Sequence, residues 1–270
     1  MKKKTKMPIW NKILLIIFIG IILFNSYTLL CWKLDEINNK KEKEEIENII
    51  NIDEIEDTEN TEIVNAPQEE LSDYWEYIKL PLINVNIREL QEVNADTIGF
   101  ISVGGTNINY PVVQSDNNEY YLNHSFKKEK NEAGWIFMDY RNNYNLTDKN
   151  TVIYGHNRID RTMFGTLSNI LKTNWLDNKN NFVIKMSTLE ENTLWQVFSV
   201  YSAQSENYYI RTNFENNEQY QDWLQEMLKR SEYNFNTSVN EKDNVLTLST
   251  CYGNNKRVVM QAKLIKKESK

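Results

Sequence analysis

The apolar residues divide the chain into three stretches of different character. Residues 13–32, ILLIIFIGIILFNSYTLLCW, contain no charged side chain. A run of this length can cross about 30 Å of hydrocarbon as a helix. Residues 33–70 are polar and acidic and contain no aromatic residue. From about residue 71 onward, apolar and aromatic side chains return at the density of a globular domain.

Within the globular stretch, short apolar runs alternate with Asn, Asp and Gly turns. Eight such runs can be identified, each of strand length. Many short strands separated by turn residues favour an all-β barrel or sandwich. The eight runs are residues 99–103, 108–113, 134–139, 151–155, 181–186, 194–203, 244–251 and 257–265.

Helical periodicity interrupts this strand pattern in two places. Tyr220, Trp223, Leu224, Met227 and Leu228 are spaced three or four residues apart and predict a helix that packs its apolar stripe on the strands. Its start could be capped by a Thr212–Glu215 capping box, by Asn216 or by Asn217. Before the first strand, LSDYWEYIKLPLINVNIRELQEVN predicts one or two helices interrupted at Pro81.

Charge is distributed unevenly along the chain and suggests its orientation. The first 32 residues carry a net charge of +5, residues 33–70 carry −10, and the remainder carries −2. Lysines before an apolar run and acids after it place the N-terminus in the cytoplasm and the rest of the chain outside. The nearly neutral remainder lacks the basic footprint of a nucleic-acid-binding protein.

These patterns predict four segments. Residues 1–12 form a basic cytoplasmic tail, 13–32 a transmembrane anchor, 33–70 an acidic stalk and 71–270 the globular domain. A cleaved signal peptide is the alternative for the apolar run, but its apolar region would be shorter and no small-x-small site follows Leu30. The stalk lacks the apolar surface needed to order itself and is expected to be solvated, with a short helix or weak coiled coil still possible.

The two cysteines, Cys31 and Cys251, lie 220 residues apart. Cys31 is at the outer end of the apolar run, where a disulfide to the globular domain would be geometrically odd. A buried cysteine is usually a small inert hydrophobe. Cys251, however, ends an apolar strand pattern in TLSTCYGNNKR, and the short Tyr252–Lys256 connection brings Arg257 to the neighbouring strand end. The pair could act on one bound group.

A thiol nucleophile requires a nearby base, and histidine exchanges protons near neutral pH. The chain has two histidines. His156 follows a strand in TVIYGHN and is the better candidate, because His124 lies in a polar loop-like stretch. Arg257 could stabilise the oxyanion formed when a thiolate attacks a carbonyl. The sequence has neither HExxH nor CxxC and predicts no metal or other cofactor.

Over most of residues 83–265, the ordered motifs NADTIGFISVGGTNINYPVVQ, DNNEYYLNH, GWIFMDYRN, TVIYGHN, MFGTL and TLSTC, followed by Arg257, resemble the sortases, and class B most closely. Sortases are membrane-anchored cysteine transpeptidases of Gram-positive bacteria. The resemblance implies an eight-stranded β-barrel with added helices, preceded by N-terminal helices and a transmembrane helix. No cofactor is implied.

The resemblance assigns roles by position. It implies that Cys251 is the nucleophile, His156 the general acid and base, and Arg257 the oxyanion-stabilising arginine. The implied reaction cleaves a C-terminal, NPxTx-like sorting signal after Thr through a thioacyl intermediate, which an amine of a peptidoglycan precursor of the lipid II type resolves. The implied substrate groove is formed by Asn118, Leu122, Ser205, Tyr209, Ile210, Ser249 and Thr250.

Two departures from class B and two alternative functions accompany these expectations. Some class B enzymes carry an acid two residues after the cysteine, proposed to orient the histidine, whereas this chain has Gly253, and its Cys-to-Arg connection is short. A Cys-His-Arg set is therefore expected rather than a Cys-His-Asp triad. One alternative is a pilin-polymerising sortase with a lysine side chain as acceptor. The other is a membrane-tethered scaffold whose thiol is incidental.

Overall fold

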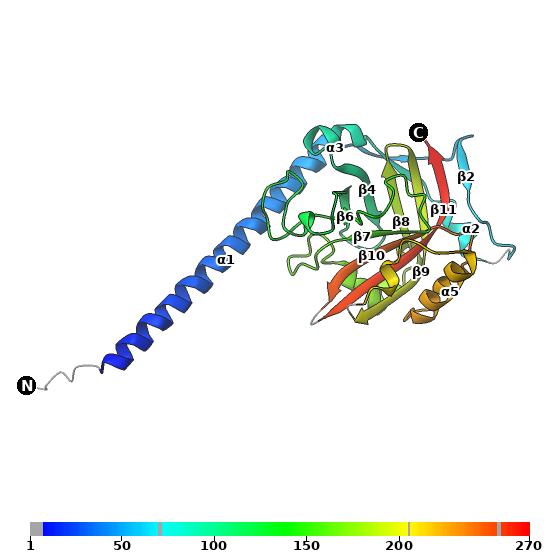
Figure 1. Cartoon of the computed structure of the whole chain (residues 1–270). Coiled ribbons are helices and arrows are strands. Elements are labelled where there is room, and N and C mark those ends of the chain that lie inside the picture. The colour runs from blue at the N-terminus through cyan, green and yellow to red at the C-terminus, as the bar shows by residue number, and fades with distance from the viewer. Residues whose placement is uncertain (1–7, 70–71, 205, 253–254) are drawn as a thin grey trace, which may run out of the picture.

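The computed structural model of the chain has a β-barrel at its centre, and one long helix, α1, extends from it (Figure 1). Side chains are described throughout the described ranges except for Cys251 and Tyr252, for which only the backbone is described. The described residues are 8–69, 72–204, 206–252 and 255–270.

The barrel closes because the last two strands pair with each other as well as with their outer neighbours. Its order is β10-β7-β6-β5-β4-β8-β9-β11, and pairing of β11 with β10 completes the ring. Closure removes the exposed sheet edges that would otherwise pair with other chains. The strands are β4 Thr97–Val103, β5 Asn109–Val113, β6 Phe137–Met138, β7 Asn150–Tyr154, β8 Val183–Thr188, β9 Glu191–Gln204, β10 Val245–Tyr252 and β11 Lys256–Ser269.

These eight strands match the eight predicted apolar runs, and the barrel rather than the sandwich is confirmed. Most barrel pairs are antiparallel, but β10 is parallel to β7 and β5 is parallel to β6. Side chains alternate across β10, so Leu246 and Leu248 enter the main apolar core while Val245 belongs to a second apolar cluster on the other face. Ser249 shares the face of Val245, and it lines a cavity together with Thr250.

The second apolar cluster lies beneath α5 (Asn217–Arg230). The predicted stripe is confirmed, because Tyr220, Trp223, Leu224 and Met227 are buried there. Asn216 is the N-cap, and its side chain accepts a hydrogen bond from the backbone of Gln219 at 2.9 Å. The remaining short helices are α4 Thr173–Leu176, η1 Tyr120–Leu122, η2 Leu167–Leu171, η3 Lys179–Asn181 and η4 Tyr208–Ile210.

Residues 72–94 form two helices with a strand between them. These are α2 (Tyr74–Tyr77), β3 (Leu82–Val85) and α3 (Ile87–Val93). The expectation of an interruption at Pro81 is met, since the first helix ends before it. The strand was not anticipated. It forms because β1 (Ile52–Ile55) supplies a partner from a distant part of the chain.

The acidic segment 33–70, expected to be a solvated stalk with a possible short helix, is helical in its first half and contacts the domain. Helix α1 (Ile9–Ile49) continues through its first half, and β2 (Thr61–Ile63) adds to the edge of β11. Composition alone could not anticipate this, because some of its polar side chains bond to the loop between η1 and β6, which is distant in the sequence. The Oδ1 atom of Asn39 accepts from Asn131 at 2.8 Å, and Ser125 donates to Glu42 at 3.1 Å.

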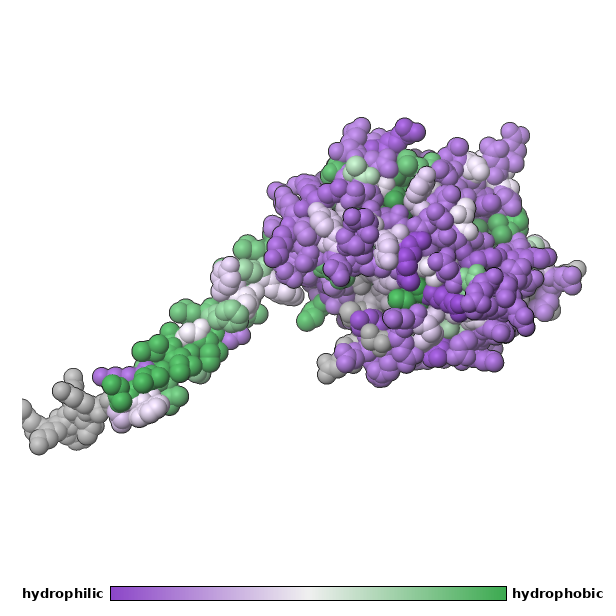
Figure 2. All heavy atoms as spheres, in the orientation of Figure 1, coloured by the Kyte–Doolittle hydropathy of each residue, from purple (hydrophilic) through white to green (hydrophobic). Residues whose placement is uncertain are grey.

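Among the described helices, α1 alone is long and apolar enough to cross a membrane. Figure 2 shows apolar side chains along its N-terminal part and a mainly hydrophilic surface over the rest of the molecule. Its C-terminal part packs on the domain, where Ile46 is buried in the main core. The helix is continuous, so its apolar part and the domain are joined without an intervening loop.

Candidate active site

Strand register brings the three sequence-predicted chemical residues into one row. Cys251 of β10 lies opposite Arg257 of β11 in the antiparallel pair. On its other side, β10 pairs with β7 up to Ser249 opposite Tyr154. Extending that register by two residues places His156 level with Cys251. Because neighbouring strands lie about 4.8 Å apart, all three residues meet at one edge of the barrel.

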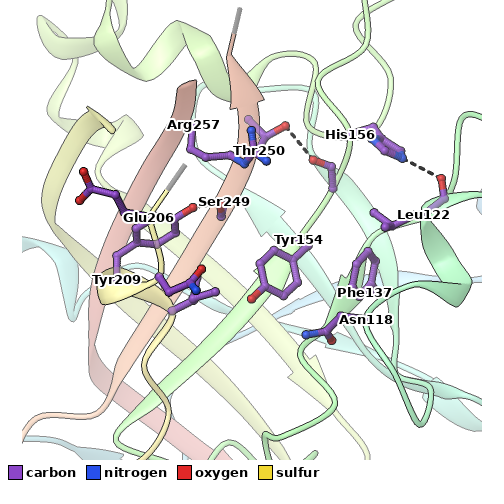
Figure 3. A pocket seen from close by; sticks show the side chains of 13 residues that line it. Asn118, Leu122, Phe137, Tyr154, His156, Glu206, Tyr209, Ser249, Thr250 and Arg257 are labelled. Atoms are coloured by element: carbon purple, nitrogen blue, oxygen red, sulfur yellow. Dashed lines mark hydrogen bonds between the residues drawn. The ribbon is translucent and has the colours of Figure 1, made fainter. Parts of the chain in front are cut away.

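A hydrogen bond beyond the end of β7 holds this extended register. Thr250 donates its hydroxyl to the backbone oxygen of Gly155 at 2.7 Å, and both residues are buried. Thr250 directly precedes Cys251 and Gly155 directly precedes His156, so the bond fixes the backbone positions of these two residues relative to each other. In Figure 3, Thr250 lies between Arg257 and His156, joined to its partner by a dashed line. The side chain of Cys251 lies outside the described residues.

The imidazole of His156 is oriented by backbone rather than by an acid. Its Nε2 atom donates to the backbone oxygen of Leu122 at 2.7 Å. A carbonyl oxygen can only accept, so Nε2 carries the proton and Nδ1 is the nitrogen left for proton exchange with a reacting group. At the position two residues after the cysteine, where an orienting acid was considered, this chain has Gly253, which lies outside the described residues.

A glycine makes room for this arrangement. Gly134 has a φ of +59°, and a Cβ there would lie 2.8 Å from the Leu122 oxygen and 3.0 Å from the imidazole of His156. Any other residue would displace the carbonyl or the ring. Gly134 is the first residue of the GWIFMDYRN motif and lies before β6, and the sequence pattern gives no indication of its role beside His156.

A cavity of about 250 Å³ opens next to this row (Figure 3). It brings His156 and Arg257 together with six of the seven predicted groove residues. The seventh, Ser205, lies outside the described residues. The six are Asn118, Leu122, Tyr209, Ile210, Ser249 and Thr250. His124, the alternative histidine, does not line the cavity and stacks on Tyr120 with ring centroids 4.0 Å apart.

The walls of the cavity are tied to the sheet by side-chain hydrogen bonds. The hydroxyls of Tyr209 and Ser249 lie 3.1 Å apart and are buried, which fastens η4 over β10. On the opposite wall, the side-chain oxygen of Asn118 accepts from the backbone of Tyr140 at 3.0 Å. Both walls are therefore preformed, which lowers the entropic cost of binding an extended chain between them.

The floor of the cavity depends on a carboxylate that the sequence analysis did not single out. Asp139 is fully buried and accepts five hydrogen bonds from three neighbouring residues within 3.0 Å. Arg141 pairs with it at 2.7 Å, Tyr154 donates its hydroxyl at 2.8 Å, and Asn118 donates its amide at 3.0 Å. One buried charge thus holds β7, the loop carrying Asn118 and the arginine in place.

The charge state of this cluster follows from its contacts. Burial opposes ionisation of Asp139, but the hydrogen bonds from Arg141 and Tyr154 outweigh it and lower the pKa of the carboxyl below its usual value. Burial and the neighbouring carboxylate raise the pKa of Tyr154 far above its usual value. Tyr154 therefore keeps its proton and remains a donor to Asp139.

The cavity also contains residues that the sequence analysis missed. Their nature explains why, since an aromatic or a buried acid in a strand pattern suggests core packing. Asp139 belongs to the GWIFMDYRN motif and Tyr154 to TVIYGHN, and this position in a motif is the one indication of their importance that the sequence offers. The missed lining residues are Phe137, Tyr154, Gly155, Glu206 and Asn207.

Replacement of Asp139 by asparagine should destabilise the protein and change its acid sensitivity. Breaking a buried ion pair costs about 3 kcal/mol, so the free energy of unfolding at neutral pH should fall by that amount. Because the folded-state pKa is lowered, the contribution of Asp139 is fully present above its unfolded pKa of about 3.9 and is lost as pH falls through the folded value. Urea unfolding at about pH 7 and pH 3 measures both effects.

The matched control is Asp116→Asn, which changes an exposed carboxylate of the neighbouring loop. It should leave the unfolding free energy within about 0.5 kcal/mol of the parent value. The role assigned to the buried carboxylate would be contradicted if the two variants behaved alike. It would also be contradicted if Asp139→Asn lost as much unfolding free energy on acidification as the parent protein does.

Comparison with known proteins agrees with this site. A Sortase domain model matches residues 101–265. Sortase B of Listeria monocytogenes is 39% identical over 185 residues, which cover 67% of this chain and 74% of that protein. A sortase B structure from B. anthracis has a TM-score of 0.68 and 33% identity, covering 86% of this chain and 99% of its own.

A third similar protein was solved with a ligand in place. The Staphylococcus aureus sortase B–substrate complex has a TM-score of 0.62 and 39% identity, covering 67% of this chain and 84% of its own. The family match spans the strands from β4 to β11 that build the row of Cys251, His156 and Arg257. The chain therefore belongs to the sortase family, in its class B, and is a cysteine transpeptidase.

Proposed function

We propose that this sortase is anchored in the membrane by residues 13–32 and attaches exported proteins to the cell wall. Its substrates are secreted proteins with a C-terminal, NPxTx-like sorting signal, and its acceptor is an amine of a peptidoglycan precursor. The observation that carries the proposal is the cavity that joins His156 and Arg257 to the groove residues beside the backbone of Cys251.

The proposed topology has one crossing. Residues 1–12 carry the lysines and remain in the cytoplasm, while the domain of residues 71–270 lies outside. The part of α1 beyond residue 32 extends about 25 Å at 1.5 Å per residue. Because this part packs on the domain through Asn39 and Glu42, it acts as a stiff spacer that sets the height of the cavity above the membrane surface.

In the proposed acylation, the sulfur of Cys251 attacks the carbonyl carbon of the substrate threonine and its proton passes to Nδ1 of His156. The carbonyl oxygen gains negative charge, which the guanidinium of Arg257 stabilises. As the C–N bond breaks, His156 returns the proton to the leaving amine, and a thioester remains on Cys251.

In the proposed second half, an amine attacks the thioester from the side of the β10–β11 turn. His156 takes a proton from the attacking amine and gives it to the departing sulfur, which restores the thiol. The Thr250–Gly155 bond and the Leu122 carbonyl keep the imidazole in place during both proton transfers. Preorganisation of this kind removes reorientation from the barrier.

The Cys251→Ala variant should lose all cleavage of an NPxTx peptide, because no thioester can form without the sulfur. Its fold should be unchanged. Peptide cleavage by the full-length protein in detergent, followed by chromatography, measures the loss, and circular dichroism checks the fold. Undiminished peptide cleavage by a correctly folded Cys251→Ala protein would contradict the proposal.

Replacement of Arg257 by alanine should lower kcat about 100-fold with little change in KM, since the interaction develops only in the transition state. Steady-state kinetics on the same peptide measure both constants. Arg88→Ala, an exposed change on α3, is the control and should not alter either constant. An Arg257→Ala enzyme that loses affinity but keeps kcat would assign this arginine to ground-state binding instead.

The Thr250→Val variant tests whether the bond to Gly155 positions the reacting residues. Valine keeps the shape but cannot donate, so kcat should fall about 10-fold while KM changes little. Thr247→Val is a matched control, because Thr247 makes a similar buried bond from β10 to Asn150 of β7 at 2.7 Å. Both variants should lose about 1 kcal/mol of stability. Equal kcat values for the two would reduce Thr250 to a structural role.

Product analysis identifies the acceptor. With a peptidoglycan-type amine, the proposal predicts a product joined through the substrate threonine to that amine. A ladder of covalent pilin multimers linked through lysine side chains would instead support the pilin-polymerising alternative.

A further inference from the structure

The groove does not end at the cavity beside the catalytic row. A second cavity of about 610 Å³ shares Asn118, Asn207 and Ile210 with the first, and neither His156 nor Arg257 lines it. The four residues that line only the second cavity are Tyr140, Arg141, Tyr208 and Arg211. We name this second cavity the upstream pocket. Its residues come from the loop before η1, from the segment after β6, and from η4 with the residues that flank it.

The direction of a bound peptide follows from the chemistry proposed above, on which this inference rests. The acyl part of the substrate must stay bound after the leaving fragment departs, so it requires the enclosed groove. The other side must stay open for the incoming amine. The residues before the sorting motif therefore run from the first cavity past Asn118 and Ile210 into the upstream pocket.

The two arginines of the upstream pocket differ in their charge balance. Arg141 is neutralised by the buried Asp139 at 2.7 Å and also donates to the backbone oxygen of Ile210 at 3.0 Å. Its role is to hold η4 against the segment after β6. It therefore contributes little net charge to a ligand in the pocket.

Arg211 is held by neutral groups only. Its Nε donates to the backbone oxygen of Asn213 at 2.9 Å, and one terminal nitrogen donates to Gln219 at 2.6 Å. Within the described residues, no carboxylate forms an ion pair with Arg211. A guanidinium has five N–H donors in a fixed plane, so a held arginine with donors to spare is preorganised for a carboxylate.

The rest of the pocket suits an extended peptide. Tyr140 is 52% exposed and offers an aromatic surface at the rim. Tyr208 is covered on one side by Arg230, whose guanidinium lies 3.9 Å from the ring centroid. The acidic lining residue Glu206 belongs to the first cavity rather than to the upstream pocket. The first cavity holds both this acid and Arg257, whereas the residues that line the upstream pocket include two arginines and no acid, so negative charge is favoured in the upstream pocket.

We propose that the upstream pocket binds the two or three substrate residues that precede the sorting motif and that Arg211 selects an acidic side chain among them. The substrate class is thereby narrowed to exported proteins whose sorting signal follows an acidic residue. Selection acts on binding, because these residues lie away from the scissile bond.

The test uses three fluorescent peptides that share one NPxTx motif and carry Asp-Asp, Asn-Asn or Lys-Lys directly before it. Affinity is measured by anisotropy on the full-length Cys251→Ala protein in detergent, so no turnover is needed. The Asp-Asp peptide should bind at least about fivefold more tightly than the Lys-Lys peptide, and high salt should reduce the difference.

Arg211→Gln should abolish this difference, while Arg88→Gln, which removes the same charge from exposed α3, should preserve it. Equal affinities for the three peptides, or a difference that survives in Arg211→Gln, would overturn the upstream pocket. Parallel cleavage assays with the unmodified protein separate the two proposals. Charge-graded binding without any cleavage would support the pocket and overturn only the proposed transpeptidation.

Discussion

The register of three adjacent strands is the constraint on which the rest of the site depends. Pairing of β10 with β11 closes the barrel and sets Cys251 opposite Arg257. Parallel pairing of β10 with β7 brings the end of β7 to the same level, where Thr250 is bonded to Gly155. A slip of one residue in either pair would turn the reacting side chain to the other face. The strand pairings that close the barrel therefore also set the relative positions of Cys251, His156 and Arg257.

Two kinds of support surround this row. Backbone groups position His156, through the Leu122 carbonyl and the space left by Gly134. Side chains position the groove, through the buried Asp139 that gathers Asn118, Arg141 and Tyr154. A buried carboxylate is costly unless every lone pair is used, and here the bonds it accepts extend to both cavities. Asp139 consequently holds both Tyr154 of the first cavity and Arg141 of the upstream pocket.

Sequence alone predicted the elements that have a local period. The barrel strands were predicted from short apolar runs between turn residues, and α5 from apolar residues spaced three or four apart. Both patterns depend only on residues that are close in the sequence. Segment 33–70 was not, because its polar side chains are satisfied by partners such as Ser125 and Asn131 that only the fold brings near. The candidate catalytic residues were chosen by residue type, and the fold places His156 and Arg257 beside one cavity. The carbonyl that holds His156 was not predictable, because every residue carries one.

The central claim is that the sulfur of Cys251 forms a covalent thioester with the acyl part of the substrate. It is tested most directly by incubating the full-length protein with an NPxTx peptide in the absence of an amine acceptor and measuring its intact mass at early times. The account predicts a mass increase equal to the acyl fragment ending in threonine, located at Cys251 by peptide mapping and removed when an amine is added. Peptide cleavage without any adduct, or an adduct on another residue, would contradict it.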